Sequence, residues 1–224
     1  MFSRLELLIG DKTEKLKASK VIIFGVGGVG GYAAEMLVRT GIGSLTIVDY
    51  DNVDISNKNR QIIALDSTIG MPKVEALKNR LMDINKDCVI TDINSKLLKD
   101  NINDFNLTSY DYIVDAIDMV TSKVALIDFA NKNNIKIISA MGAGNRIGIP
   151  ECVIGDIFET SNDGLAKVLR HNLRKLGIEK HKVVYFKNKS IANPQPNVIG
   201  SISYYPAISG SMLAAQVIDD LLMN

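Results

Sequence analysis

The sequence predicts an α/β fold in which a Rossmann-like, doubly wound and mainly parallel sheet is followed by an elaborated C-terminal part. Short apolar runs alternate with segments of helical spacing as far as Gly144, which is the rhythm of βαβ units. Runs such as VIIF and YIVDAI are almost continuously apolar, as expected of strands that helices cover on both faces. The first of these runs leads directly into a glycine-rich turn and a helix.

Five strands and three helices are expected in the first part of the chain. We place the strands near residues 21–24, 45–49, 88–93, 111–115 and 135–140. We place the helices near residues 30–40, 72–84 and 121–133. Because ligands bind at the carboxyl ends of parallel strands in such folds, polar residues that follow these strands are the candidate site residues.

The pattern changes after Gly144. We expect a basic amphipathic helix at residues 164–175, a strand KVVYF, a mobile loop ANPQPN and an apolar helix at residues 207–223 that begins after Pro206. The last helix packs on the sheet or serves an oligomer contact. This part is too small for a separate domain, so we predict one domain over 1–224, with a nucleotide-binding core at 1–145 and a substrate side at 146–224.

Composition restricts the class of protein. No apolar run approaches the roughly 20 residues that span a bilayer, and the N-terminus lacks a signal-peptide pattern, so we expect a cytoplasmic protein. Neither Cys88 nor Cys152 belongs to a C-x-x-C pair, so both are interpreted as core residues. The net charge of +1 makes no case for nucleic acid, although basic residues gather at 167–189, where a solvated face is the simpler interpretation.

The glycine-rich turn predicts a nucleotide site. Glycine permits positive φ and close approach of a phosphate, and the following helix N-terminus attracts its charge. The turn residues are Gly25, Gly27, Gly28 and Gly30. Asp49 ends the second strand at about the spacing where a carboxylate meets a ribose hydroxyl. By itself this motif also suits a nicotinamide oxidoreductase, and a purely structural turn is the bland alternative.

A polar cluster after the second strand favours triphosphate chemistry. Asn57, Arg60 and Gln61 lie in a segment too polar for the core, and Lys73 follows Pro72 at an expected helix start. Cations there can neutralise charge on an α-phosphate and pyrophosphate, which hydride transfer does not need.

Two acidic residues are expected to close the strand YIVDAID. They are Asp115 and Asp118, and a carboxylate at a strand's carboxyl end is well placed for a metal or a substrate. Each residue alone could be a surface charge, but together at one sheet edge they indicate a functional site.

Four motifs in this order resemble the ubiquitin-activating-type adenylyltransferases, a family that includes bacterial enzymes for sulfur-carrier proteins. The motifs are GVGGVGG, VDYDNVDISNKNRQ, IGMPKVEALKNRLMDIN and DAIDMVTSK. Within that family, MGAGN, the basic tract LAKVLRHNLRKLGI and the last segment GSISYYPAISGSMLAAQVIDDL most resemble its tRNA-modifying dehydratases. The resemblance implies ATP-dependent activation of a carboxylate as an acyl-adenylate, here the threonine carboxyl of threonylcarbamoyladenosine in tRNA, followed by cyclisation.

The resemblance also implies site residues, cofactors and partners. It assigns ATP binding to Gly25, Gly27, Gly28, Gly30, Asp49, Asp51, Asn57, Arg60, Lys73 and Arg4. It makes Arg60, Lys73 and Asp118 catalytic, and Asp118 the ligand of Mg²⁺. Arg4 matches an arginine that such enzymes lend to the neighbouring subunit, which implies a homodimer. The implied partner is tRNA, and a sulfurtransferase-type protein is a second candidate partner.

The chain departs from the family pattern in a few places. Met119 replaces an asparagine found in many carrier-activating relatives, and the zinc-binding cysteine pairs of several relatives are missing, which favours the dehydratase. Gly164, Phe186 and the ANPQPN loop differ from the dehydratase pattern, which weakens the assignment of RNA contacts. Activation of a small sulfur-carrier protein is the alternative function, and a non-catalytic nucleotide-binding scaffold is another.

Overall fold

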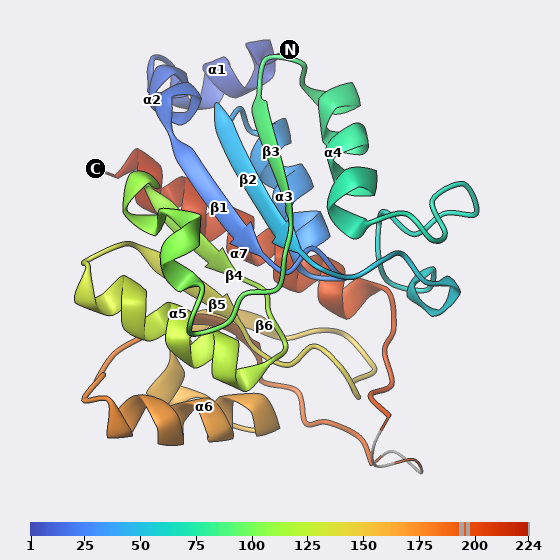
Figure 1. Ribbon diagram of the computed structural model, residues 1–224, viewed down its shortest axis with the longest axis vertical. Coiled ribbons are helices and arrows are strands. Elements are labelled where there is room, and N and C mark those ends of the chain that lie inside the picture. The colour runs from blue at the N-terminus through green and yellow to red at the C-terminus, as the bar shows by residue number, and fades with distance from the viewer. Residues whose placement is uncertain (193–194, 196–197, 224) are drawn as a thin grey trace.

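A computed structural model describes residues 1–192, 195 and 198–223. Its seven strands form one sheet in the order β3-β2-β1-β4-β5-β7-β6, with helices on both faces (Figure 1). The predicted α/β, doubly wound architecture is confirmed. The predicted mobility of the loop ANPQPN concerns residues that lie mostly outside the described ones.

The first three strands are parallel and buried, or partly buried, between helices. They are β1 (Lys20–Phe24), β2 (Ser44–Asp49) and β3 (Val89–Asn94). The register sets Val21 beside Leu45 and Ile22 beside Thr46, so their carboxyl ends meet at one edge. The connecting helices are α3 (Gly30–Arg39) and α4 (Lys73–Ile84), within one or two residues of the predicted bounds.

The next two strands continue the parallel sheet. They are β4 (Tyr112–Asp115) and β5 (Ile137–Ala140), joined by α5 (Val120–Lys132). The expectation that Asp118 closes the fourth strand is wrong, because pairing with β1 ends at Asp115. Asp118 lies in the loop between β4 and α5, which frees its side chain from the sheet.

The C-terminal part completes the sheet. Strand β7 (Lys182–Phe186) lies parallel to β5, and β6 (Cys152–Asp156) pairs with β7 in the antiparallel sense at the edge. The basic helix is confirmed as α6 (Gly164–Lys175). The last helix, α7 (Tyr204–Leu222), begins earlier than predicted, because the first turn of a helix tolerates Pro206, whose missing N–H has no partner there.

Helices cover the sheet in two layers. Buried side chains of α2 (Lys12–Ala18), α3, α4 and α7 share one apolar cluster, whereas α5 and α6 pack on the opposite face. Neither α1 (Ser3–Ile9) nor α2 was predicted, and α1 has no buried residue. Short 3-10 helices occur at Ile55–Asn57, Ile102–Phe105, Leu107–Ser109 and Ile157–Glu159. No helix of the described ranges is long and apolar enough to cross a membrane.

Both cysteines behave as predicted core residues. Cys88 is buried just before β3 and contributes to the main apolar cluster, and Cys152 packs against that cluster from β6. Burial raises the pKa of the Cys88 thiol to about 11 and that of Cys152 to about 12. Neither thiol is therefore ionised near neutral pH, which argues against a nucleophilic role.

Candidate nucleotide site

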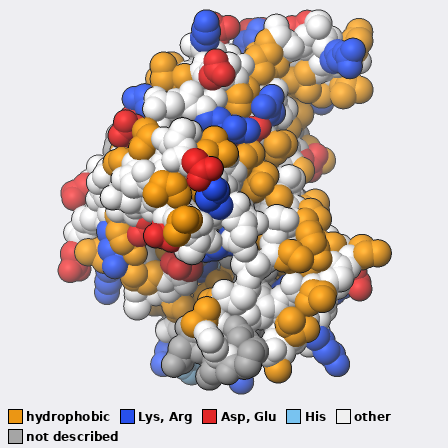
Figure 2. Space-filling model, turned by 90° about the vertical axis from the view of Figure 1, so that its right-hand side faces the viewer, with side chains coloured by type: hydrophobic (Ala, Val, Ile, Leu, Met, Phe, Trp, Pro, Cys, Tyr) orange, Lys and Arg blue, Asp and Glu red, His pale blue; other side chains and the backbone are white. Residues whose placement is uncertain are grey.

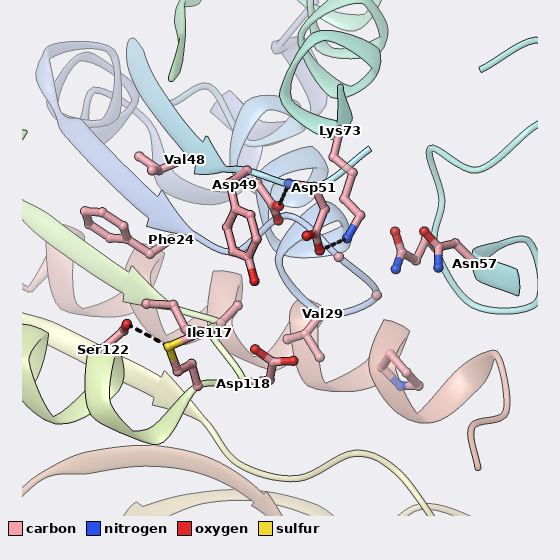
Figure 3. Close-up of a pocket in the computed structure, with 18 of the residues that line it drawn as sticks. Phe24, Val29, Val48, Asp49, Asp51, Asn57, Lys73, Ile117, Asp118 and Ser122 are labelled. Carbon is pink, nitrogen blue, oxygen red and sulfur yellow. Dashed lines mark hydrogen bonds and ion pairs between the residues drawn. The ribbon is translucent and has the colours of Figure 1, made fainter. Parts of the chain in front are cut away.

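A cavity of about 470 Å³ opens at the carboxyl ends of β1, β2 and β4 (Figure 3). Its walls come from the glycine turn after β1, the segment after β2, the start of α4 and the loop before α5. This volume suits a nucleotide-sized ligand, and the position is the one that a doubly wound sheet reserves for ligands.

The four predicted glycines divide into two kinds. Gly25 has φ +83°, and a Cβ there would approach the carbonyl oxygen of Ala116 to 2.7 Å. Gly30 does not line the cavity, and a Cβ on it would collide with the Gly25 carbonyl oxygen. Gly25, Gly27 and Gly28 do line the cavity. Gly25 and Gly30 therefore shape the turn, and Gly27 and Gly28 present the backbone that a phosphate can approach.

Asp49 holds the turn to the end of β2. One carboxylate oxygen accepts the Val26 N–H at 2.8 Å, and the other accepts the Asp51 N–H at 2.9 Å. The side chain lines the cavity although the residue is only 9% exposed. Its predicted contact with a ribose stays a prediction, and its positioning role was not foreseen.

Lys73 and Asp51 form an ion pair on the cavity wall. Lys73 is the first residue of α4 and follows Pro72, as predicted. Its ammonium lies 2.7 Å from Asp51 Oδ2, and the two side chains point toward each other in Figure 3. The lysine side chain is 8% exposed and that of Asp51 is 48% exposed, so the pair opens to the cavity through its carboxylate.

Asn57, Arg60 and Gln61 reach the same cavity from the polar segment after β2. Asn57 Oδ1 accepts the Asp54 N–H at 3.1 Å in a capping box, which fixes the side chain. Arg60 donates to the Ser56 carbonyl at 2.8 Å. Gln61 is buried and lines the cavity, and its Oε1 has no hydrogen-bond partner among the described residues, so it belongs to the site although the family resemblance assigned it no role.

The two aspartates after β4 have different surroundings. Asp118 is exposed and lines the cavity across from the Asp51–Lys73 pair (Figure 3). Asp115 is fully buried and pairs with Lys123 Nζ at 2.7 Å. The expectation that Asp115 faces a metal or substrate is therefore wrong, because that carboxylate is sealed inside the sheet.

Arg4 does not line the cavity of its own chain. It lies exposed on α1, outside the cavity wall. Its predicted contact with ATP therefore requires a second copy of the chain.

Several cavity residues were missed by the sequence reading. Phe24, Val48 and Ile117 form an apolar wall, and the Lys96 ammonium lies 4.9 Å from the centre of the Tyr50 ring. Such a wall suits a flat heterocycle such as a base. The sequence signal was weak, because each residue is an ordinary strand end or loop residue.

Comparison with known proteins supports one class. The ThiF family matches residues 3–223, so the chain belongs to the ThiF family. The chain is similar to the tRNA threonylcarbamoyladenosine dehydratase of Bacillus subtilis (strain 168), with 38% identity over an aligned length of 241 residues. The alignment covers 100% of this chain and 95% of that protein.

Solved structures agree in fold. The E. coli tRNA N6-threonylcarbamoyladenosine dehydratase TcdA, in complex with ATP, superposes with a TM-score of 0.92 at 30% identity, covering 99% of this chain and 93% of that chain.

The molybdopterin-synthase adenylyltransferase of Escherichia coli (strain K12) is a more limited match in sequence. It is 40% identical, but the alignment covers only 49% of this chain and 44% of that protein. The sequence likeness to the Bacillus subtilis dehydratase covers the whole chain, and the likeness to this adenylyltransferase covers about half of it.

Proposed function

We propose that this protein is an ATP-dependent dehydratase that adenylates the threonine carboxylate of threonylcarbamoyladenosine in tRNA and promotes its cyclisation. The observation that carries the proposal is the end-to-end likeness to the Bacillus subtilis dehydratase, which includes residues 146–224, the predicted substrate side. The cavity supplies the groups that such a reaction needs.

Backbone and cations would hold the triphosphate. The N–H groups around Gly27 and Gly28 and the N-terminus of α3 attract phosphate oxygens. The Arg60 and Lys73 side chains lie across the same cavity, where they stabilise charge that develops as the carboxylate attacks the α-phosphate and pyrophosphate leaves. Lys73 would exchange its partner Asp51 for a phosphate oxygen.

The charges of the cavity call for further cations. The lining carboxylates are Asp49, Asp51 and Asp118, and the lining cations are Arg60, Lys73 and Lys96. These formal charges cancel, so the wall does not by itself offset a triphosphate. A divalent ion and the arginine of a second subunit would supply the missing positive charge.

Asp118 fits a magnesium ion that is held mainly by substrate. In the described part of the chain, no group of three or more His, Cys, Asp or Glu side chains could hold a metal by itself. Mg²⁺ usually binds one or two carboxylates together with substrate phosphates, and the exposed carboxylate of Asp118 matches that mode. When bound there, Mg²⁺ would neutralise phosphate charge.

Helix α1 suits an interface with a second copy. Leu7 and Leu8 are 85% and 83% exposed, and they stand three and four residues after Arg4, on the same side of the helix. A second subunit that covered these leucines would receive Arg4 near its surface. We therefore propose a homodimer in which Arg4 completes the partner's ATP site. A cytoplasmic location and a sulfurtransferase-type partner stay predictions.

The cyclisation step needs no nucleophilic side chain. Once the acyl-adenylate has formed, the carbamoyl group of the same nucleoside attacks the acyl carbon and AMP leaves, so the nucleoside loses one water overall. Neither cysteine lines the cavity, in agreement with an intramolecular attack.

Mass spectrometry of nucleosides tests this function. Wild-type protein, ATP, Mg²⁺ and tRNA bearing threonylcarbamoyladenosine should yield a nucleoside lighter by one water, and Lys73→Ala should yield little. A wild type that binds ATP and leaves the nucleoside unchanged would contradict the proposal. Pyrophosphate exchange that depended on a small carrier protein would then favour the alternative activity.

A further inference from the structure

The basic segment at 167–189 is not one surface in the folded protein. Arg170 donates to the Thr160 carbonyl at 3.0 Å, and the Arg174 guanidinium lies 5.2 Å from the Phe158 ring centre. Lys182 pairs with Asp220 at 2.7 Å. These three cations already have partners within the protein, and the exposed lysines of the segment are the remaining candidates for contacts with RNA phosphates.

The fold divides the remaining exposed lysines into two sets. Strand β7 has five residues, a length of roughly 17 Å, with Lys180 before its start and Lys187 after its end. Lys167 lies in the first turn of α6, and Lys175 is its last residue, about 12 Å away. The first set, with Lys167 and Lys187, therefore lies at the carboxyl end of the sheet. The second set, Lys175 and Lys180, lies toward the opposite end.

Arg146 gathers the chain segments that carry the first set. Its side chain is 2% exposed, and it donates to the carbonyls of Gly142 at 3.2 Å and Asn162 at 3.0 Å and to that of Asn188. Asp163, also buried, accepts the Gly142 N–H at 2.9 Å and caps α6 through the Ala166 N–H. The loop after β5, the start of α6 and the segment after β7 thus meet at one buried junction.

This junction adjoins the mouth of the nucleotide cavity. Ala143 and Gly144 belong to the same loop and line that cavity. Lys187 and Lys189 flank Asn188, and Lys167 follows Asp163 by about one helical turn. The three lysines are exposed and define what we name the rim cluster: Lys167, Lys187 and Lys189.

The described residues present no broad positive surface in the view of Figure 2. Positive, negative and hydrophobic side chains are intermixed over that face of the molecule. The whole chain carries a net charge of only +1. An RNA partner must therefore be held by a local group of cations, and lysine contacts to phosphates are independent of sequence.

We propose that the rim cluster binds the tRNA phosphates that flank the modified nucleotide, whereas Lys175 and Lys180 do not contact RNA. The choice of RNA rests on the proposed function. The buried Arg146–Asp163 junction fixes these lysines beside the cavity mouth, which places the threonine carboxylate near the α-phosphate of ATP. Binding at the rim thereby contributes to positioning as well as affinity.

Two double variants with equal loss of charge test the proposal. The affinity for tRNA is measured at several salt concentrations for Lys187→Ala/Lys189→Ala and for the control Lys175→Ala/Lys180→Ala. We expect the rim variant to lose about tenfold or more at low salt, with a salt slope reduced by about 1.4 for two lost phosphate contacts. The control variant should stay within about twofold of wild type, and ATP affinity should not change in either.

The outcomes separate this surface from the activity. Equal losses in both variants, no loss in the rim variant, or a wild type that binds no tRNA would overturn the rim proposal. A wild type that binds tRNA through the rim without producing the lighter nucleoside would support the surface and overturn the proposed function. A wild type that converts the nucleoside while the rim variant binds tRNA normally would support the proposed function and overturn the rim proposal.

Discussion

Two lysine–aspartate pairs of equal length lie in contrasting parts of this molecule. Lys73–Asp51 and Lys123–Asp115 both measure 2.7 Å. Asp51 is 48% exposed at the nucleotide cavity, whereas both side chains of the second pair are 0% exposed. The same ionic contact therefore occurs once in an open place and once in a sealed one.

The sealed pair is part of a continuous polar chain. Asp115 also accepts the Ser139 hydroxyl at 2.6 Å and the Ile117 N–H at 3.1 Å, and Ser139 lies 2.8 Å from His181 Nε2. Every group is used internally, so this pair stabilises the sheet and fixes the loop that carries Asp118. The open pair keeps groups that a phosphate can reach. Accessibility, and not distance, distinguishes the open pair from the sealed pair.

The largest expected effect is on stability and comes from the sealed pair. Lys123→Met leaves the Asp115 carboxylate buried without its cation, which costs about 3–5 kcal/mol of unfolding free energy. Urea denaturation measures this cost. Lys73→Met is the matched control and should cost about 1 kcal/mol or less, because Asp51 can be hydrated. Equal losses would remove the distinction between the pairs.

The open pair should dominate turnover. Lys73→Ala is expected to lower kcat by roughly 10²–10³-fold, because it removes a cation that stabilises developing phosphate charge. Lys78→Ala provides a control on the same helix. The Lys78 ammonium lies 2.6 Å from the Asp92 carboxylate, and neither residue lines the cavity. Rates of nucleoside dehydration are compared at saturating ATP. A control that fell as far as Lys73→Ala would contradict the assignment.

The glycine turn repeats the contrast between sealed and open positions. Gly30→Ala forces a methyl group onto the Gly25 carbonyl and should destabilise the fold by about 1–3 kcal/mol or more. Gly27→Ala first meets the Gln61 amide, at 3.6 Å, so its stability should change little while ATP affinity falls. Thermal unfolding and ATP titration of both variants give the comparison. Normal stability in Gly30→Ala would show that the turn is not sealed.

The sealed chain also predicts a pH dependence of stability. Burial, followed by the charge of Lys123, lowers the pKa of His181 to about 3 from an ordinary value of 6.5. Below about pH 6.5 the unfolded state therefore binds a proton at the His181 imidazole, and the folded state does not. Stability is fully present above pH 6.5 and falls as the pH drops through the window toward 3, by up to about 1.4 kcal/mol per unit.

A pair of histidine variants isolates that contribution. Unfolding is measured between pH 7 and 5, above the range where carboxylates dominate. His181→Gln should flatten the fall in stability over this window, and His171→Gln, at an exposed position, should retain it. A steep fall that survived in His181→Gln would locate the titrating group elsewhere.

Local patterns predicted the architecture and much of the cavity. The glycine turn and Lys73 follow from rules that act over a few residues: strand, turn and helix start. The roles of Asp115 and Asp118 could not be separated in this way, because Lys123 and Ser139 reach Asp115 only through the packed sheet. The two N-terminal helices were missed, and α1 in particular buries no residue.

The basic segment shows the same limit. Its charges are evident in the sequence. Which of its basic side chains contact Thr160, Phe158 and Asp220 can be identified only in three dimensions. Likewise the junction at Arg146 joins segments up to 46 residues apart in number, between Gly142 and Asn188, and no local pattern indicates it.

Isotope transfer tests the central claim, that the site activates a carboxylate by attack on the α-phosphate of ATP. Threonylcarbamoyladenosine in tRNA is labelled with ¹⁸O in its threonine carboxyl group, and the products of one turnover are examined by mass spectrometry. We predict AMP that carries one ¹⁸O atom, since the carboxylate oxygen bonded to phosphorus leaves with AMP. Label in inorganic phosphate, or unlabelled AMP beside a dehydrated nucleoside, would contradict adenylation at this site.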